Sequence, residues 1–293
     1  MYIIYYRNSL KYGKFKYKIR ALMEHSQSYK SFMKSSYNSI KHSTYFDSYD
    51  HFFKDFRNKK ITFVEIGVLA GGSLFMWRDY FGPKARIIGI DFNPNAKKWE
   101  KHGFEIFIGS QSDENFWNEF KTKVGNIDIL LDDGGHTYEQ QIITTECLLD
   151  AINDGGLLVI EDTHSSYMKN YGKRKYSFIE YTKKKVDSIN MRFKDISGLE
   201  PERRIWSIEF VESMVAFKIN KKASYMKSEP ISNDGENDHA EDYVYRNADI
   251  SAKMKSFFNK VNISTDNRLV KRIIRKFEKI STKRKFSAKK YFD

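Results

Sequence analysis

The chain has 293 residues, a formal net charge of +13 at pH 7 and a single cysteine, Cys147. A chain of this length can bury a full hydrophobic core without disulfides or a structural metal, and a single cysteine excludes a disulfide framework within the chain. The sequence has no apolar run long enough to span a bilayer, and its short apolar start is unlike a secretory leader. We therefore expect a cytoplasmic protein in a reducing compartment, with Cys147 as a buried structural thiol.

The positive charge is concentrated at the two ends of the chain. We divide the chain into a helical N-terminal extension (1–58), a central domain (59–220), an acidic polar linker or loop (221–250) and a basic helical tail (251–293). For the amphipathic tail, two interpretations stay open: a solvated helix docked by its apolar face, or peripheral contact with an anionic membrane surface or partner. Whether the protein forms a homo-oligomer also stays open.

The pattern before residue 61 is helical, with aromatic residues at helical spacing in YFDSYDHFFKDFR (Tyr45–Arg57). From residue 61, apolar runs alternate with amphipathic segments. The predicted strands are ITFVEIG, ARIIGID, FEIFIG, IDILLDD and GGLLVIED, and the helices between and after them are GSLFMWRDYF, NAKKWEKHG, DENFWNEFKTKV, TYEQQIITTECLLDAI and SFIEYTKKKVDSI. IWSIEF and SMVAFKI then predict a closing hairpin. The pattern indicates a Rossmann-like α/β fold, with a mostly parallel seven-stranded sheet, a C-terminal antiparallel hairpin and helices on both faces.

A glycine-rich turn follows the first predicted strand, which contains Glu65 and leads to Gly67, Gly71 and Ser73. Glycine permits tight turning and close approach of the backbone to a ligand, and the next helix presents its N-terminal N–H groups at the same point. The dinucleotide fingerprint G-x-G-x-x-G is absent, because Leu69 stands at its second glycine. The segment therefore predicts a ligand site. Its spacing, E-x-G-x-x-x-G-x-S, resembles the first motif of class I methyltransferases. That resemblance implies a cofactor without a pyrophosphate, with the acidic residue near its positive charges.

The second and third strands end in further polar residues. Asp91 is placed to accept hydrogen bonds from two ribose hydroxyls, and Gln111 and Ser112 could reach an adenine edge. The alternative for Asp91 is a helix cap before Asn95. Together with the glycine turn, the pattern favours ligand binding.

The fourth strand ends in LDDGGH, which contains Asp132, Asp133 and His136. Adjacent carboxylates are costly to bury without a compensating cation. In the interpretation we favour, Asp132 lies at the cofactor site, Asp133 helps to bind a metal, and His136 takes a proton from an acceptor hydroxyl. The alternative is that both aspartates cap the helix that begins near Thr137.

The fifth strand ends in EDTH, which contains Glu161, Asp162 and His164. Neighbouring parallel strands end at the same edge of a sheet, so Asp133 and Asp162 could meet as oxygen ligands of a divalent cation such as Mg²⁺. Such an ion would lower the pKa of an acceptor hydroxyl or diol. Glu161 is a third candidate ligand, and for His164 a loop histidine with one hydrogen bond is an equal alternative.

Four segments in order, EIGVLAGGSLFMWRDYF, IIGIDFNP, DDGGHTYEQQI and GGLLVIEDTHSSY, resemble the macrolide sugar O-methyltransferases of the mycinamicin and macrocin type. They are also similar to related cephalosporin-hydroxylase-like and polysaccharide methyltransferases. The resemblance covers about residues 40–170. It implies a class I methyltransferase fold, S-adenosylmethionine as cofactor, Mg²⁺ held by Asp133 and Asp162, and His136 as the base. Gly135 departs from the family, which usually has serine there.

Three functions compete at this point. The first is a metal-assisted O-methyltransferase that acts on a sugar hydroxyl of a glycan, polysaccharide or glycosylated metabolite. The second is a catechol-type methyltransferase for small molecules, which is similar in layout. The third is a nucleic-acid-binding protein on a methyltransferase scaffold, which the sequence disfavours because its basic segments are not interleaved with aromatic residues in an RNA-binding pattern.

Overall fold

The structure, a computed structural model, describes residues 23–193, 196, 198–226, 228–235, 256–258, 260, 268–284 and 291, with the side chains of 268–284 described as far as 276. The chain divides into two compact units, Met1–Glu229 and Pro230–Asp293, and each is considered separately. The boundary between them falls inside the predicted linker, most of which lies outside the described residues. The domain limits drawn from the sequence stay a prediction.

The first unit is built on a seven-stranded sheet with the order β3-β2-β1-β4-β5-β7-β6. The strands are β1 (Thr62–Ile66), β2 (Arg86–Asp91), β3 (Glu105–Ile108), β4 (Ile127–Asp132), β5 (Ile152–Ile160), β6 (Ile205–Val211) and β7 (Met214–Ile219). Strands β1 to β5 pair in parallel, whereas β7 is antiparallel to both β5 and β6. The predicted fold class is therefore confirmed, including its closing hairpin.

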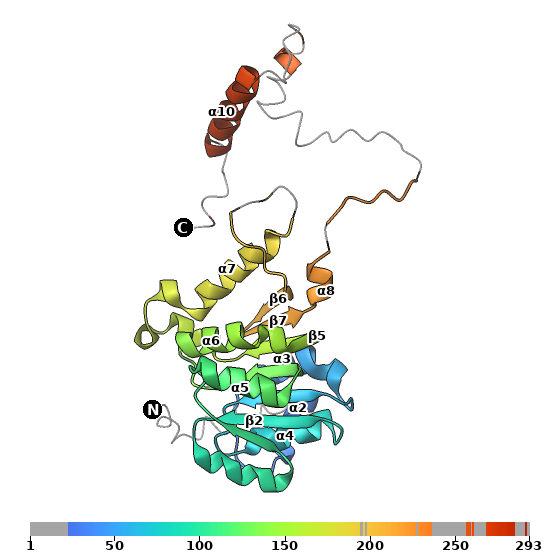
Figure 1. The fold of residues 1–293 in the computed structure, drawn as a ribbon, viewed down its shortest axis with the longest axis vertical. Helices are drawn as coiled ribbons and strands as arrows, with labels where there is room; N and C mark the ends of the chain where they lie inside the picture. Colours follow the sequence, from blue (N-terminus) through green and yellow to red (C-terminus); the bar gives the residue numbers. More distant parts are fainter. Residues whose placement is uncertain are drawn as a thin grey trace. The chain divides into compact units, whose positions relative to one another are not determined.

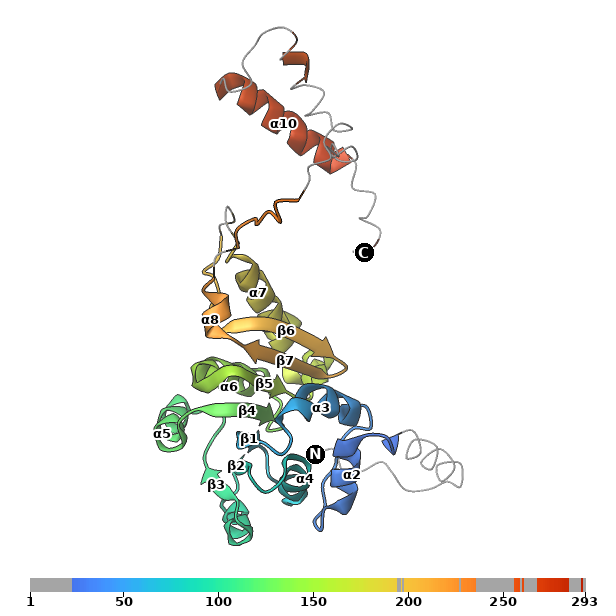
Figure 2. The same ribbon diagram turned by 90° about the vertical axis from the view of Figure 1, so that its right-hand side faces the viewer.

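Helices cover both faces of the sheet (Figures 1 and 2). One face carries α2 (Gln27–Lys34), α3 (Tyr45–Phe53), α4 (Gly72–Phe81) and the 3₁₀ segment η2 (Pro94–His102), and the other carries α5 (Glu114–Val124), α6 (Tyr138–Leu148) and α7 (Phe178–Asn190). Shorter elements are η1 (Lys54–Phe56), η3 (Leu149–Ala151), η4 (Thr163–Tyr167), η5 (Lys169–Tyr171), η6 (Arg174–Tyr176) and α8 (Lys221–Ser224). Alternation along the strands creates the two cores, because Phe63 packs on the first face and Val64 on the second.

Side-chain caps start the helices just beyond the carboxyl ends of the strands. Asn93 accepts a hydrogen bond from the Asn95 N–H at the start of η2. Thr137 forms a capping box with Gln140 at the start of α6. Asp91 therefore does not cap η2, and Thr137, rather than the preceding aspartates, caps α6.

Helix α3 joins the core of the first unit. The Tyr49 ring lies 5.0 Å from that of Trp77, which in turn lies 5.1 Å from Phe63 on β1. Phe53 is also fully buried in this cluster. The helix predicted from the aromatic spacing is therefore confirmed as α3. It fixes the preceding segment, residues 35–44, at the carboxyl edge of the sheet.

The second unit contains α10 (Arg268–Arg284), in agreement with the helix predicted for the basic tail. Val270 and Ile274 are buried, whereas Leu269 is exposed. Within the described part of the chain, no helix is both long and apolar enough to cross a membrane.

Candidate active site

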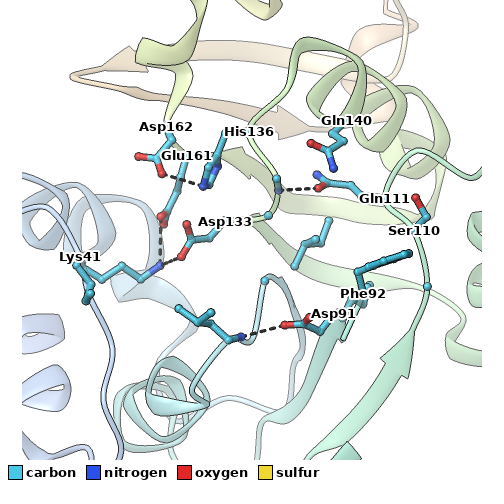
Figure 3. A pocket seen from close by; sticks show the side chains of 18 of the residues that line it. Lys41, Asp91, Phe92, Ser110, Gln111, Asp133, His136, Gln140, Glu161 and Asp162 are labelled. Atoms are coloured by element: carbon cyan, nitrogen blue, oxygen red, sulfur yellow. Dashed lines mark hydrogen bonds and ion pairs between the residues drawn. The ribbon is translucent and has the colours of Figure 1, made fainter. Parts of the chain in front are cut away.

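A cavity of about 650 Å³ lies at the carboxyl edge of the parallel strands (Figure 3). Its walls come from the turns after β1 to β5 and from residues 40–45. The lining residues are Ile40, Lys41, His42, Tyr45, Ile66, Gly67, Leu69, Ile90, Asp91, Phe92, Gly109, Ser110, Gln111, Asp133, Gly134, Gly135, His136, Gln140, Glu161 and Asp162. This volume is in the range of sites for cofactors and drug-sized ligands.

The glycine turn after β1 forms one wall of the cavity. The Val68 and Leu69 N–H groups both donate to Asp91 Oδ2, at 2.9 Å each. Gly67 has a φ of 92°, and a Cβ there would overlap the carbonyl oxygen of Asp133. Only glycine allows this backbone conformation at such close approach to the β4 turn.

Asp91 both holds this turn and faces the cavity. Its Oδ1 atom accepts a hydrogen bond from the Asn93 N–H at 2.8 Å. The carboxylate also lines the cavity beside Phe92, whose side chain is exposed. Carboxylate oxygens have several lone pairs, so these backbone contacts leave Asp91 able to accept hydrogen bonds from a ligand.

Glu65 and Ser73 lie behind the glycine wall rather than on it. Glu65 is fully buried, and it accepts hydrogen bonds from Ser73 Oγ at 2.7 Å and Trp77 Nε1 at 3.0 Å. Burial raises the pKa of Glu65 to about 7, although Lys41 opposes the rise. The cavity lining includes neither Glu65 nor Ser73 nor Gly71. These three predicted cofactor residues therefore support the wall from beneath.

Gln111 and Asp132 form a buried pair behind the β4 turn. Gln111 Nε2 donates to Asp132 Oδ1 at 2.7 Å and to Thr144 Oγ1 at 3.1 Å, and its Oε1 accepts from the Gly135 N–H. Burial raises the pKa of Asp132 to about 6. Although Gln111 lines the cavity, both its amide hydrogens are engaged by protein, and Ser112 does not line it. The pair therefore sets the shape of the turn that carries the catalytic candidates.

Asp133, His136 and Asp162 come together as the sequence predicted (Figure 3). His136 Nε2 lies 3.3 Å from Asp162 Oδ2, and the three residues offer metal-ligand atoms all within 4.8 Å of one another. His136 and Asp162 have φ values of 57° and 53°. Non-glycine residues in this left-handed region are uncommon and cluster at functional sites.

Sequence reasoning missed Lys41, which lies between the strand-end carboxylates. Its Nζ atom is 2.6 Å from Asp133 Oδ2, 3.2 Å from Glu161 Oε2 and 3.9 Å from Glu65 Oε1. The Tyr49 hydroxyl donates to the other Glu161 oxygen at 2.6 Å. Burial lowers the pKa of Lys41, but the negative charges of Asp133 and Glu161 raise it by a larger amount. The net pKa therefore lies well above the usual value of a lysine. Burial also raises the pKa of Glu161. No local motif marks Lys41, and the only signal was the unbalanced charge of the carboxylates.

Asp162 has a second group of neighbours around its other carboxylate oxygen, Oδ1. The Tyr45 hydroxyl donates to Asp162 Oδ1, and the His164 and His42 rings lie 3.7 and 4.0 Å from that atom. His164 Nδ1 also forms a hydrogen bond with Ser213 Oγ. His42, Asp162 and His164 offer a second set of ligand atoms within 4.8 Å of one another. His164 thus lies beside Asp162, and its side-chain hydrogen bond to Ser213 leaves both interpretations of this residue open.

Comparisons with known proteins find similarity to methyltransferases. Residues 64–163 match the family described as methyltransferase domain. The chain is 35% identical over 136 residues to a tetracenomycin rhamnosyl 3'-O-methyltransferase of Streptomyces olivaceus, covering 42% of this chain and 33% of that protein. It is 33% identical over 131 residues to mycinamicin VI 2''-O-methyltransferase of Micromonospora griseorubida, covering 42% of this chain and 32% of that one. The chain thus spans about a third of the length of these curated relatives.

The fold agrees with that assignment. The crystal structure of MycE, a methyltransferase of mycinamycin biosynthesis in complex with Mg and SAH, matches with a TM-score of 0.55 and 26% identity. The match covers 60% of this chain and 48% of MycE. Residues 64–163, which match the family, contain the whole glycine turn and both strand ends that carry the catalytic candidates. Residues 64–163 therefore match the methyltransferase-domain family, and part of the chain is similar to O-methyltransferases named for tetracenomycin and mycinamicin.

Proposed function

We propose that the protein transfers a methyl group from S-adenosylmethionine to a hydroxyl of a sugar, on a glycan or a glycosylated metabolite. The observation that carries this proposal is the opposition of two walls in one cavity. The glycine turn and Asp91 form one wall, and Asp133, His136 and Asp162 form another. A cofactor on the first wall would present its methyl group to an acceptor held at the second.

On the cofactor side, each contact has a simple chemical counterpart. The Asp91 carboxylate suits the two ribose hydroxyls, and exposed Phe92 offers an apolar surface beside it for a flat base. Gly67 lets the cofactor approach the backbone closely. Glu65, Gly71, Ser73 and the Gln111–Asp132 pair act indirectly in this proposal, by holding the two turns in shape.

On the acceptor side, His136 is the base. As the bond from the hydroxyl oxygen to the methyl carbon forms and the sulfur–carbon bond breaks, the hydroxyl proton passes to the His136 imidazole. Asp162, 3.3 Å from His136 Nε2, orients the ring and stabilises its protonated form. The neutral thioether S-adenosylhomocysteine is the other product. Most of the remaining rate enhancement comes from holding the oxygen in line with the sulfur–carbon bond.

Asp133 and Asp162 are the residues that would hold a divalent cation such as Mg²⁺. Their carboxylate oxygens suit a hard cation and lie within 4.8 Å of one another, close enough to share one ion beside His136. When bound, such an ion supplies charge that lowers the pKa of the acceptor hydroxyl. MycE, with which the chain shares its fold, was crystallised with Mg and SAH, which supports the same set of ligands for this protein.

The acceptor is proposed from the relatives. The tetracenomycin and mycinamicin enzymes are named for O-methylation of sugar-bearing natural products. The match to the first of these covers 42% of this chain and 33% of that protein. We therefore propose the class of acceptor, a sugar hydroxyl, rather than a particular compound.

Transfer of a radioactive methyl group from S-adenosylmethionine to a panel of glycosides, with catechol as the competing acceptor, tests the proposal. We expect labelled glycoside, a rate reduced by EDTA and restored by Mg²⁺ or Mn²⁺, and no label in catechol. His136→Ala should lower kcat by about 10²–10⁴-fold while the Kd for S-adenosylhomocysteine stays within about threefold. Label in catechol alone would favour the small-molecule enzyme, and full activity in Asp133→Ala would exclude the metal-assisted mechanism.

A further inference from the structure

We propose that Lys41 is a positioning residue that removes Glu161 from the set of metal ligands and weakens the binding of a divalent ion at Asp133. The inference rests on the proposed function, because it concerns the same cation site. It makes Lys41 a resident counter-ion of the site, and it limits the ligands contributed by the fifth strand to Asp162.

The contacts of Glu161 carry the first step. Lys41 Nζ donates to Glu161 Oε2 at 3.2 Å, and the Tyr49 hydroxyl donates to Oε1 at 2.6 Å. Each oxygen of this carboxylate therefore has a strong donor already. The side chains of Glu161 and Lys41 are 1% and 2% exposed, so water does not compete for either group.

The neighbouring Asp162 has a different environment. Its Oδ2 atom faces His136 at 3.3 Å, and its side chain is 18% exposed. No lysine or arginine among the described residues pairs with Asp162 in an ion pair. Adjacent acidic residues at the end of β5 thus have separate roles: Glu161 pairs with a fixed ammonium, and Asp162 faces the cavity.

Charge carries the second step. The Lys41 ammonium is 2.6 Å from Asp133 Oδ2, so an ion bound to the Asp133 carboxylate would lie close to a fixed positive charge. Like charges that lie close together repel, and water screens this repulsion poorly at Lys41, whose side chain is 2% exposed. The ion must therefore either bind Asp133 against this repulsion or displace the ammonium. Both routes weaken its affinity relative to a site without the lysine.

A double-mutant cycle on Lys41 and Glu161 tests the inference by direct metal binding. Calorimetric titration of Mn²⁺ and of Mg²⁺ is carried out on the full chain with and without S-adenosylhomocysteine. We expect Lys41→Met to lower the Kd for the divalent ion at least tenfold, because the repulsion is gone and Glu161 is free to act as a ligand. Glu161→Gln alone should change that Kd by less than about threefold. In the double variant K41M/E161Q, the part of the gain that comes from the freed Glu161 carboxylate should be lost, and only the part that comes from relief of the repulsion at Asp133 should remain.

Lys34→Met is the matched control, since Lys34 lies on α2 and pairs with Asp79 outside the cavity; it should leave the Kd unchanged. An unchanged or weaker Kd in folded K41M, or additive effects of the two substitutions, would overturn the inference. If K41M does not fold without metal, the E161Q variant still tests the inference. A tenfold weaker binding of the divalent ion to E161Q would show that Glu161 is a ligand despite Lys41, and would overturn the inference. Absence of S-adenosylhomocysteine binding in the wild type would refute the proposed function, whereas the metal titrations without it would still test Lys41.

Discussion

Replacing Glu65 by glutamine removes the most deeply buried acid of the site while preserving its shape. The carboxylate accepts hydrogen bonds from Ser73 Oγ and Trp77 Nε1. A glutamine can accept from the Trp77 N–H through its oxygen and donate to the Ser73 hydroxyl through its amide. The substitution therefore removes the charge and leaves each partner with one hydrogen bond to the side chain.

The size of the effect follows from the pKa of Glu65, which burial raises from 4.5 to about 7 in the folded protein. Between these two pH values the folded state holds the proton more tightly than the unfolded state does, so this group's contribution makes stability fall as pH rises. Each pKa unit of difference between the two states corresponds to about 1.4 kcal/mol. The unfolding free energy therefore falls by about 3 kcal/mol by the pH at which Glu65 is ionised in both states. Glu65→Gln does not titrate and should lose nothing from this source.

Urea denaturation of the wild type and of Glu65→Gln at pH 5 and pH 8 measures the difference. From pH 5 to pH 8, the unfolding free energy of Glu65→Gln should rise by about 2 to 3 kcal/mol relative to that of the wild type. Glu119→Gln, a substitution of an exposed acid on α5, should show no comparable gain. Parallel pH profiles for wild type and Glu65→Gln would refute the argument that burial raises the pKa of Glu65.

Three further substitutions test the walls of the cavity. Gly67→Ala should weaken S-adenosylhomocysteine binding at least tenfold by calorimetry, because its Cβ would push the turn away from Asp133; unchanged affinity would contradict the close packing. Asp91→Ala should weaken the same binding about 10- to 100-fold, through loss of the ribose contacts and of the turn's hydrogen bonds, and an effect below threefold would remove Asp91 from the site. Gln111→Ala should lower the unfolding free energy by about 2 kcal/mol in urea, since buried Asp132 loses its amide donor; a neutral result would mean that water replaces that donor.

Much of the fold follows from local sequence rules. Each parallel strand is a short apolar run that ends in an acid or is followed directly by a glycine or an acid. Helix α4 begins and ends where the sequence predicted, at Gly72 and Phe81. The strand ends meet because parallel strands finish at one edge, so Asp133, His136 and Asp162 could be brought together without coordinates. Local rules suffice here because each motif acts within its own strand and turn.

The remaining features depend on long-range packing. Lys41 reaches Asp133 and Glu161 across 92 and 120 residues of sequence, from a segment that reads as a polar extension. The argument from charge did indicate that these carboxylates need a cation, but a lysine without a motif cannot be singled out among 51 lysines and arginines. Gln111 likewise faces Asp132, since tertiary packing rather than the GSQSD pattern decides where its amide points.

A crystal structure of the protein grown with S-adenosylhomocysteine and a divalent cation tests the central claim most directly. The account predicts that S-adenosylhomocysteine occupies the cavity with its ribose against Asp91 and its sulfur directed toward His136, and that the cation contacts Asp133 and Asp162. A cavity that stays empty at saturating S-adenosylhomocysteine, or a ligand bound away from the glycine turn, would contradict it.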